Sequence, residues 1–594
     1  MPGKTPYKGT SRSLVLGIDI GTTFSGVSYA FLDPGEIPKI QIVTRFPGQE
    51  NVSAKIPSIL YYSDDGTMFA AGAEAVSPAM RLEAEDRNLT RAEWWKLHLC
   101  PDALVSDELR QRLPPLPDGK DAVSILADML AYLFSCTRVF ITESHPLGES
   151  MWSSAANDIQ VVLSHPNGWE GPQQEKMRQA AVIAGLVPDT IGGRDRVHVV
   201  TEGEASLHYC IERGILSHAL QDGETVIIAD AGGGTVDVTT YGVVTADPIV
   251  LQEVAAPECL LEGSTMINER MECLLKTKLA KSRYGNSEDI MCMLESFEKT
   301  AKPTFRDDKD RSYIKFGSIR DNDPDFKIRS GQIVLEGSEV AACFAPSVMK
   351  IIDTVHAQRL MSGRPISKVI LVGGYADSPW LHMHLQRALK DVGITVCRPE
   401  SHANKAVAEG ATSFYLEHFV SGRVARFAYG TMCVVEYNPQ DSDHVKRRGK
   451  AYTRPSGRTV IPNSFNMILA KGTCLRENDE VCSQGFYKEA SSAAALKKIS
   501  TTIVCYRGSV KAPRWTDAEP ERFSTLCTIF ADTTQVKKEK KTRDGCTYYA
   551  LDFKVVLLCG STEMKAMISW MDDGKERRGP AKIVYDDDTE VSLG

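Results

Sequence analysis

Three short segments place the strongest constraint on what this chain can fold into. They are residues 16–23 (LGIDIGTT), 228–237 (IADAGGGTVD) and 369–375 (VILVGGY). Each is an aliphatic run that ends in glycine, and aspartate and threonine accompany the glycine in the first two. The pattern predicts a buried strand followed by a turn that presents bare N–H groups, hydroxyls and a carboxylate. Such groups bind polyphosphates and their metal ions, so the three segments together indicate a nucleotide site between two lobes.

Length and composition narrow the class of protein. At 594 residues the chain is too long for one core, and about 150 residues per domain suggests three or four structural units. Apolar residues make up 42% and charged residues 25%, as in soluble globular proteins. The net charge of −8 argues against a general nucleic-acid binder. No segment approaches the roughly 18 uninterrupted apolar residues of a membrane span. We therefore expect neither a nucleic-acid partner nor a membrane span.

The fifteen cysteines indicate a reducing compartment. Their number is odd, they are scattered along the chain, and no C-x-x-C pair occurs. This arrangement argues against a disulfide framework and against a zinc site. The first thirteen residues are polar and basic, without the apolar stretch of a secretory signal. A cytoplasmic location is therefore expected.

The order of predicted elements indicates an α/β region followed by an all-β region. Two predicted hairpins, residues 14–31 and 225–244, are each followed by alternating strands and helices, which suggests an internally duplicated α/β unit. Helices are expected over 122–142, 260–281, 339–359 and 379–390. After residue 421 the predicted elements are short strands, at 432–437, 465–469, 501–506, 523–530, 548–558 and 566–570.

The residues of the first two motifs suit phosphate binding, although neither motif is one of the common phosphate-binding loops. The Gly-x4-Gly-Lys-Ser/Thr loop and the dinucleotide fingerprint are both absent. What remains is a pair of hairpin turns, residues 21–23 and 232–235, whose N–H groups can surround the β- and γ-phosphates from opposite sides. Asp19 and Asp230 stand at the strand ends, where they can hold hydrated Mg²⁺.

The three motifs, in this order and at these separations, resemble those of the seventy-kilodalton heat-shock chaperones (DnaK-like proteins). The similarity covers roughly residues 14 to 415. It implies an actin-like, two-lobed ATPase of ribonuclease-H-like duplicated units over 14–420. It also implies a β-sandwich-like, peptide-binding domain over 421–594. Residues 468–473 (ILAKGT) faintly resemble the opening strand of that sandwich, and no predicted helical segment supplies the family's lid. The divergence is closest to the atypical branch of these chaperones.

The resemblance implies a role for each motif residue, with ATP or ADP and Mg²⁺ as ligands. Asp19 and Asp230 would bind Mg²⁺ through water, and Thr22 and Thr23 would contact the phosphates. Further residues would surround the nucleotide, with the last two bordering the adenosine: Gly21, Gly232, Gly233, Gly234, Thr235, Asp237, Gly373 and Gly374.

Two residues outside the motifs would join Asp230 in catalysis. Glu202, in Thr-Glu-Gly-Glu, would orient the attacking water, although a solvated charge at a helix start is the alternative. Lys96 falls where the family has its catalytic lysine. A surface lysine whose stem packs beside Trp95 is an equal alternative on sequence alone.

Two positions depart from the family pattern near the expected adenine. Asp377 stands where the family has an arginine that lies against the base, and Asn404 stands where it has an aspartate. The residues expected at the phosphates and the metal match the family pattern. The two departures therefore concern how the base packs and which base is selected.

Three hypotheses for function follow. The first is an ATP-binding, slowly ATP-hydrolysing chaperone-like protein, in which the nucleotide state controls binding of unfolded or client polypeptides by the β-rich domain, with possible co-chaperones. The second is a small-molecule kinase of the same fold. The third is a pseudo-ATPase scaffold that senses nucleotide and does not hydrolyse it.

Overall fold

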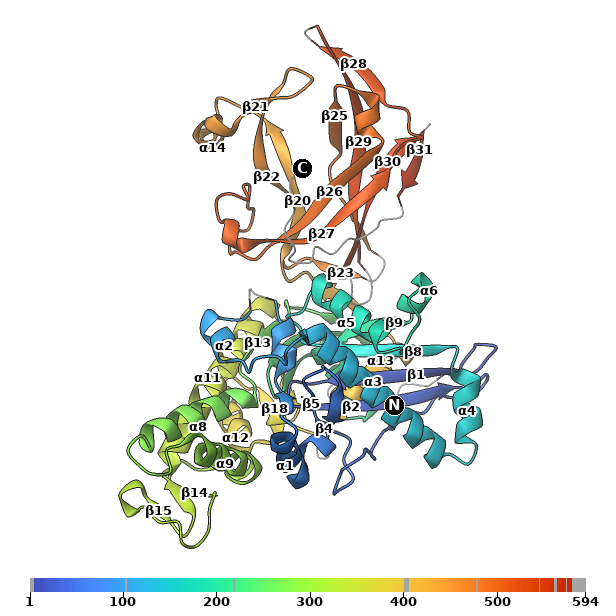
Figure 1. Ribbon diagram of the computed structural model, residues 1–594. Helices are drawn as coiled ribbons and strands as arrows, with labels where there is room; N and C mark the ends of the chain where they lie inside the picture. The colour runs from blue at the N-terminus through green and yellow to red at the C-terminus, as the bar shows by residue number, and fades with distance from the viewer. Residues whose placement is uncertain are drawn as a thin grey trace. The chain divides into compact units, whose positions relative to one another are not determined.

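The chain divides into two compact units. The computed structural model describes residues 5–101, 104–216, 220–399, 405–476, 479–543, 545–559, 564–572 and 574–579 (Figure 1). Unit 1 comprises Met1–Trp169 and Lys176–Val420, and unit 2 comprises Glu170–Glu175 and Ser421–Gly594. The expected nucleotide-site residues all belong to unit 1.

The first sheet of unit 1 is built around β1 (Ser13–Ile20), which is buried along its whole length. It pairs antiparallel with β2 (Phe24–Leu32) and parallel with β8 (Ile159–His165), which pairs parallel with β9 (Val197–Thr201). Two short strands, β3 (Gln41–Ile42) and β4 (Ile56–Pro57), lie beside β2. A strand buried on both faces needs a continuous apolar run, and residues 14–18 supply one.

The second sheet repeats this arrangement. β10 (Thr225–Ala231) pairs antiparallel with β11 (Val236–Ala246) and parallel with β17 (Lys368–Val372), which pairs parallel with β18 (Thr395–Cys397). Beyond β11 lie β12 (Ile249–Glu253) and β13 (Glu258–Leu260). Even the hairpin turns match, because the Gly21 N–H donates to the Phe24 carbonyl and the Gly232 N–H donates to the Thr235 carbonyl. The expected internal duplication is confirmed.

Helices cover both sheets of unit 1 (Figure 1). The two longest are α3 (Ala122–Ser144) and α11 (Gly337–Ser362), which by length and composition alone could cross a membrane. Each is a core helix here, because its apolar side chains pack into the core of one half of unit 1. The other helices that lie wholly or partly in unit 1 are α1 (Pro78–Asp86), α2 (Asp107–Arg112), α4 (Gly148–Ala155), α5 (Gly171–Ile183), α6 (Ile191–Arg194), α7 (Glu202–Glu212), α8 (Ser264–Lys278), α9 (Ser287–Ser296), α10 (Lys302–Thr304), α12 (Pro379–Lys390) and α13 (Ala406–Leu416).

One helix expected from sequence begins later than predicted. The apolar spacing extends back to Leu260, but Leu260 ends strand β13 and pairs with Val236 of β11. Helix α8 begins only at Ser264. Cross-strand pairing takes these residues out of the helix, and periodicity within one segment carries no information about that pairing.

Unit 2 is built mainly of two antiparallel sheets with a shared core. One has the order β21-β22-β20-β26-β27, and the other has the order β24-β29-β30-β31, with β25 and β28 also paired to β29. Ile503 and Ile529 from the first sheet pack in one cluster with Val555 and Ile568 from the second. The strands of these two sheets are β20 (Ala428–Glu436), β21 (Tyr452–Thr453), β22 (Thr459–Leu469), β24 (Glu480–Cys482), β25 (Phe486–Ala490), β26 (Lys498–Tyr506), β27 (Phe523–Asp532), β28 (Glu539–Arg543), β29 (Cys546–Cys559), β30 (Met564–Asp572) and β31 (Lys575–Arg578).

Candidate functional site

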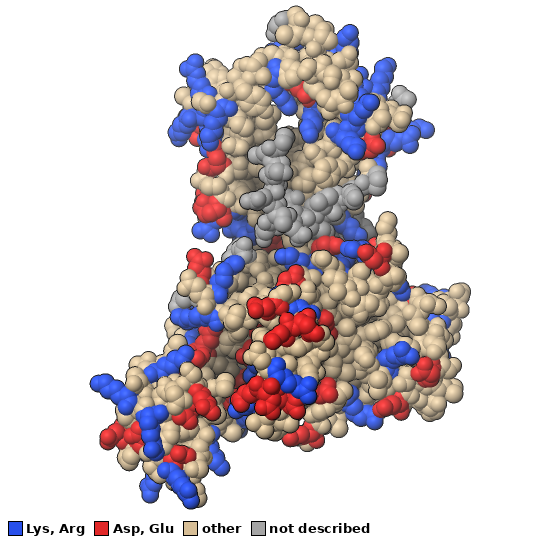
Figure 2. Space-filling view, viewed as in Figure 1, with Lys and Arg blue, Asp and Glu red and all other residues tan. Residues whose placement is uncertain are grey.

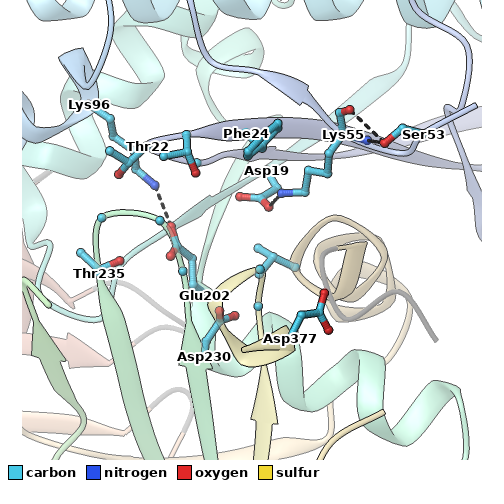
Figure 3. A pocket seen from close by; sticks show the side chains of 18 residues that line it. Asp19, Thr22, Phe24, Ser53, Lys55, Lys96, Glu202, Asp230, Thr235 and Asp377 are labelled. Carbon is cyan, nitrogen blue, oxygen red and sulfur yellow. Dashed lines mark hydrogen bonds and ion pairs between the residues drawn. The ribbon is translucent and has the colours of Figure 1, made fainter. Parts of the chain in front are cut away.

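A pocket of about 290 Å³ lies in unit 1 where the ends of β1, β10 and β17 meet. This volume is close to the lower limit for small-molecule pockets. Figure 3 shows Asp19 from β1 and Asp230 from β10 at this pocket, together with Lys55, Lys96 and Glu202. On the visible face of unit 1, acidic side chains gather in patches with basic side chains beside them (Figure 2). The pocket is lined by Asp19, Gly21, Thr22, Thr23, Phe24, Ser53, Lys55, Lys96, Glu202, Asp230, Gly232, Gly233, Gly234, Thr235, Gly373, Gly374, Asp377 and Val407.

The two glycine-threonine turns lie against each other. A Cβ atom added to Gly233 would overlap the Thr23 side chain, and one added to Gly234 would overlap Thr22. Glycine is therefore the residue that allows this close approach of the two hairpins. Gly373 follows the aliphatic run of the third motif and has a left-handed φ of +91°. A Cβ atom added to it would overlap the Asp230 side chain. The structure thus brings all three motifs to one place.

Lys96 and Glu202 form a buried ion pair. The distance from Lys96 Nζ to Glu202 Oε1 is 2.7 Å, and the two side chains are only 6% and 10% exposed. Glu202 is the first residue of α7, whose N-terminus is capped by the Thr201 hydroxyl. Lys96 follows Trp95, a buried residue whose indole N–H donates to the Ser58 carbonyl. The alternative of a surface lysine is therefore wrong, because Lys96 is buried inside unit 1.

Burial and nearby charge shift the pKa values of this pair. Burial lowers the pKa of Lys96, but attraction to Glu202 and Asp19 outweighs it, and the pKa ends above its usual value. For Glu202, burial has the opposite effect and raises the pKa, although the positive charge of Lys96 opposes the rise. A carboxylate with a raised pKa is a better proton acceptor than an ordinary glutamate.

Asp19 and Asp230 occupy equivalent positions at the ends of β1 and β10. Asp19 Oδ1 accepts a hydrogen bond from Ser164 Oγ at 3.1 Å, and Oδ2 forms an ion pair with Lys55. Asp230 Oδ2 accepts a hydrogen bond from Ser206 Oγ at 2.5 Å. Burial, followed by repulsion from Glu202, raises the pKa of Asp230 well above its usual value.

Asp19 and Asp230 are carboxylates of the kind that can hold a hydrated magnesium ion. Among the described residues, no group of three or more His, Cys, Asp or Glu side chains is arranged as a metal cage. Magnesium keeps most of its waters and needs only one or two carboxylates. Within the same described part of the chain, Asp230 has no ion-pair partner, so a divalent cation beside it would relieve the repulsion that raises its pKa.

Asp237 is the one expected nucleotide-binding residue that does not line the pocket. It lies opposite Asp230 in the β10–β11 hairpin and is fully buried. Its Oδ1 accepts the backbone N–H of Asn167 at 2.6 Å. Burial raises the pKa of Asp237 to about 7. Its contact holds the loop after β8 against the second hairpin, which is a positioning role.

Three residues whose side chains contact Asp19 or Asp230 were not identified from the sequence. Ser206 lies one helical turn after Glu202, so the spacing on α7 could have revealed it. Ser164 lies near the carboxyl end of β8, the parallel neighbour of β1, and strand order could have suggested it. Lys55 gave no signal of its own. Asp377 lines the pocket as expected for a residue near the base, whereas Asn404 lies outside the described residues.

The fold and the site together define an actin-like ATPase fold followed by a β-rich C-terminal unit. No protein-family model matches the chain. Human heat shock 70 kDa protein 12A is 24% identical to it over 484 residues, which covers 65% of this chain and 68% of that protein. The mouse protein of the same name matches equally, and human heat shock 70 kDa protein 12B is 23% identical over 493 residues, 68% of each chain. The chain is a homologue of these atypical heat-shock 70 kDa proteins, so the resemblance inferred from the motifs is confirmed.

Proposed function

We propose that unit 1 binds ATP and ADP with magnesium and hydrolyses ATP slowly, and that its nucleotide state controls polypeptide binding by unit 2. The observation that carries this proposal is the contact between two equivalent glycine-threonine turns, each with a buried aspartate behind it. Bare N–H groups on opposing turns can surround a chain of phosphates. The homology to heat-shock 70 kDa proteins supports the same reading at the level of the fold.

Each charged residue of the pocket would have a distinct role in hydrolysis. Magnesium, when bound, would neutralise phosphate charge, and Asp19 and Asp230 would hold its waters. Lys96 would place a positive charge beside the phosphates. Because Lys96 Nζ contacts Oε1 of Glu202, the other oxygen, Oε2, is left to accept a hydrogen bond from the attacking water and to orient it.

Unit 2 would bind client polypeptides, and the segment 418–427 would transmit the nucleotide state to it. Coupling between two sites is typically about 1–3 kcal/mol and is reciprocal, so a bound polypeptide would also change nucleotide affinity. A substitution in that segment, such as Val424→Asp, should leave peptide affinity the same with ATP and with ADP.

Calorimetric titration of the full chain with Mg-ATP and Mg-ADP tests the nucleotide site directly. We expect saturable binding of both nucleotides by the wild type, and a loss of tenfold or more, about 1.4 kcal/mol, in the affinity of Asp19→Ala for Mg-ATP. No heat and no thermal shift with any purine triphosphate would refute the proposal.

Hydrolysis needs a separate test, because the pocket also suits a protein that only senses nucleotide. Under single-turnover conditions we expect slow phosphate release by the wild type and a rate about 10²-fold lower in Glu202→Gln. Equal rates in the two proteins would favour the sensing function. Stimulation by a small alcohol and not by unfolded polypeptide would favour a kinase.

A further inference from the structure

Lys55 reaches the nucleotide pocket from outside the three motifs. It directly precedes β4, and the pairing of β4 with β2 places Ile56 opposite Ser25. The next residue of β2, Gly26, is paired in turn with Asp19 of β1. The backbone thus sets Lys55 beside the position in the first hairpin that faces Asp19. Figure 3 shows the Lys55 and Asp19 side chains pointing toward each other.

Gly26 leaves room for the lysine side chain to cross the hairpin. A Cβ atom added to Gly26 would lie 3.2 Å from Lys55 Cδ and 3.5 Å from its Cε. The aliphatic part of Lys55 therefore lies directly over the glycine. The loop before it is fixed as well, because Ser53 Oγ accepts the backbone N–H of Lys55 and donates to its carbonyl.

The Lys55–Asp19 ion pair is buried inside the pocket. The two side chains are 9% and 5% exposed, and both line the cavity. A charged group is seldom buried unless it is paired. Lys55 thus places its positive charge against the same carboxylate that would hold the waters of a magnesium ion.

We propose that Lys55 is an internal cation on the Asp19 side of the pocket, which lets the site bind nucleotide phosphates without magnesium. This inference rests on the proposed nucleotide binding. A site that had only the two aspartates would need magnesium to bind phosphates, whereas a site with Lys55 would not. Asp19 stays neutralised by Lys55 when no metal is bound. Lys55 lines the same pocket as the first glycine-threonine turn, Gly21 to Thr23.

Removal of Lys55 should change two affinities in opposite directions. Without the ammonium group, a metal-free nucleotide would meet the unpaired negative charge of Asp19 and bind more weakly. A divalent cation would bind the Asp19 carboxylate more tightly, because the ammonium group of Lys55 would no longer compete for it. A role for Lys55 in stability alone would not produce this pair of opposite changes.

The test uses the full-length protein and ADP as the probe, titrated calorimetrically in excess magnesium and in EDTA. The variants are Lys55→Met, Lys55→Arg and, as a matched control, Lys39→Met, which removes an exposed lysine that does not line the pocket. We expect the wild type, Lys55→Arg and Lys39→Met to bind ADP in EDTA within about threefold of their affinity in magnesium. In Lys55→Met we expect ADP affinity to fall by about tenfold or more in EDTA alone.

A second measurement follows Mn²⁺ binding to nucleotide-free protein by electron paramagnetic resonance. We expect Lys55→Met to bind Mn²⁺ about tenfold more tightly than the wild type, and Lys39→Met to match the wild type. Wild-type ADP binding that disappears in EDTA, or unchanged Mn²⁺ affinity in Lys55→Met, would overturn the role of Lys55 and leave the proposed function standing. Failure of the wild type to bind ADP even with magnesium would overturn both.

Discussion

Removal of the positive charge at Lys96 is the perturbation for which the structure gives the clearest magnitude. Lys96→Met keeps the length and most of the volume of the side chain but leaves Glu202 buried without its ion-pair partner. Breaking a buried pair by removing one member typically costs about 3–5 kcal/mol, because a charge remains that neither water nor a partner stabilises. That is a large part of the roughly 5–15 kcal/mol by which a domain is usually stable.

A second ion pair of the same length provides a matched control. Lys276 and Glu272 on α8 are also 2.7 Å apart, but their side chains are 58% and 40% exposed. An exposed i, i+4 pair contributes about 0.3–0.5 kcal/mol. Lys276→Met should therefore be nearly neutral, and burial is the main difference between the two experiments.

The assay is urea unfolding of the full chain, followed by tryptophan fluorescence. Five of the seven tryptophans lie in unit 1, and the Lys96 ammonium lies 5.5 Å from the centre of the Trp169 ring, so the signal reports on this region. We expect Lys96→Met to lose about 3–5 kcal/mol and Lys96→Met/Glu202→Gln to recover most of it. A loss of under 1 kcal/mol in Lys96→Met, as small as that of Lys276→Met, would refute the reasoning.

Three other predictions concern the surroundings of the site. Burial lowers the pKa of His165 from 6.5 to about 4, so folding favours its neutral form, and unit 1 should lose ~2 kcal/mol of stability between pH 7.5 and pH 5. Urea titrations at the two pH values should show that His165→Gln removes most of that loss. Ser206→Ala removes the buried donor to Asp230 and should cost about 1–3 kcal/mol, which thermal unfolding would detect. Gly233→Ala forces a methyl group onto Thr23 and should cost about 1–3 kcal/mol, whereas Gly374→Ala, with no neighbouring heavy atom within 4 Å, should unfold like the wild type.

Local signals in the sequence were sufficient for the three strands that end at the site. The aliphatic runs before Gly21, Gly232 and Gly373 became strands β1, β10 and β17, because a buried strand needs continuous apolar residues and the glycine ends it. The two hairpins could be expected for the same reason. The start of α8 could not, since Leu260 is held in β13 by a partner on β11.

The charge state of the pocket depends on contacts between distant segments. Lys96 could be read from the sequence as a surface residue or a site residue with equal justification, and its burial against Glu202 decides between them. Lys55 reaches Asp19 only because β4 pairs with β2 and Gly26 leaves space over the hairpin. Such pairings join residues 36 and 106 positions apart, and no local pattern encodes them.

The sequence by itself therefore determined the three strand-ending turns, their aspartates and the duplicated α/β plan, because each depends on neighbours within a few residues. Only the tertiary structure decided which cation faces which carboxylate. That choice depends on burial, since the same lysine is a weak, solvated charge at the surface and a strong partner once water is excluded.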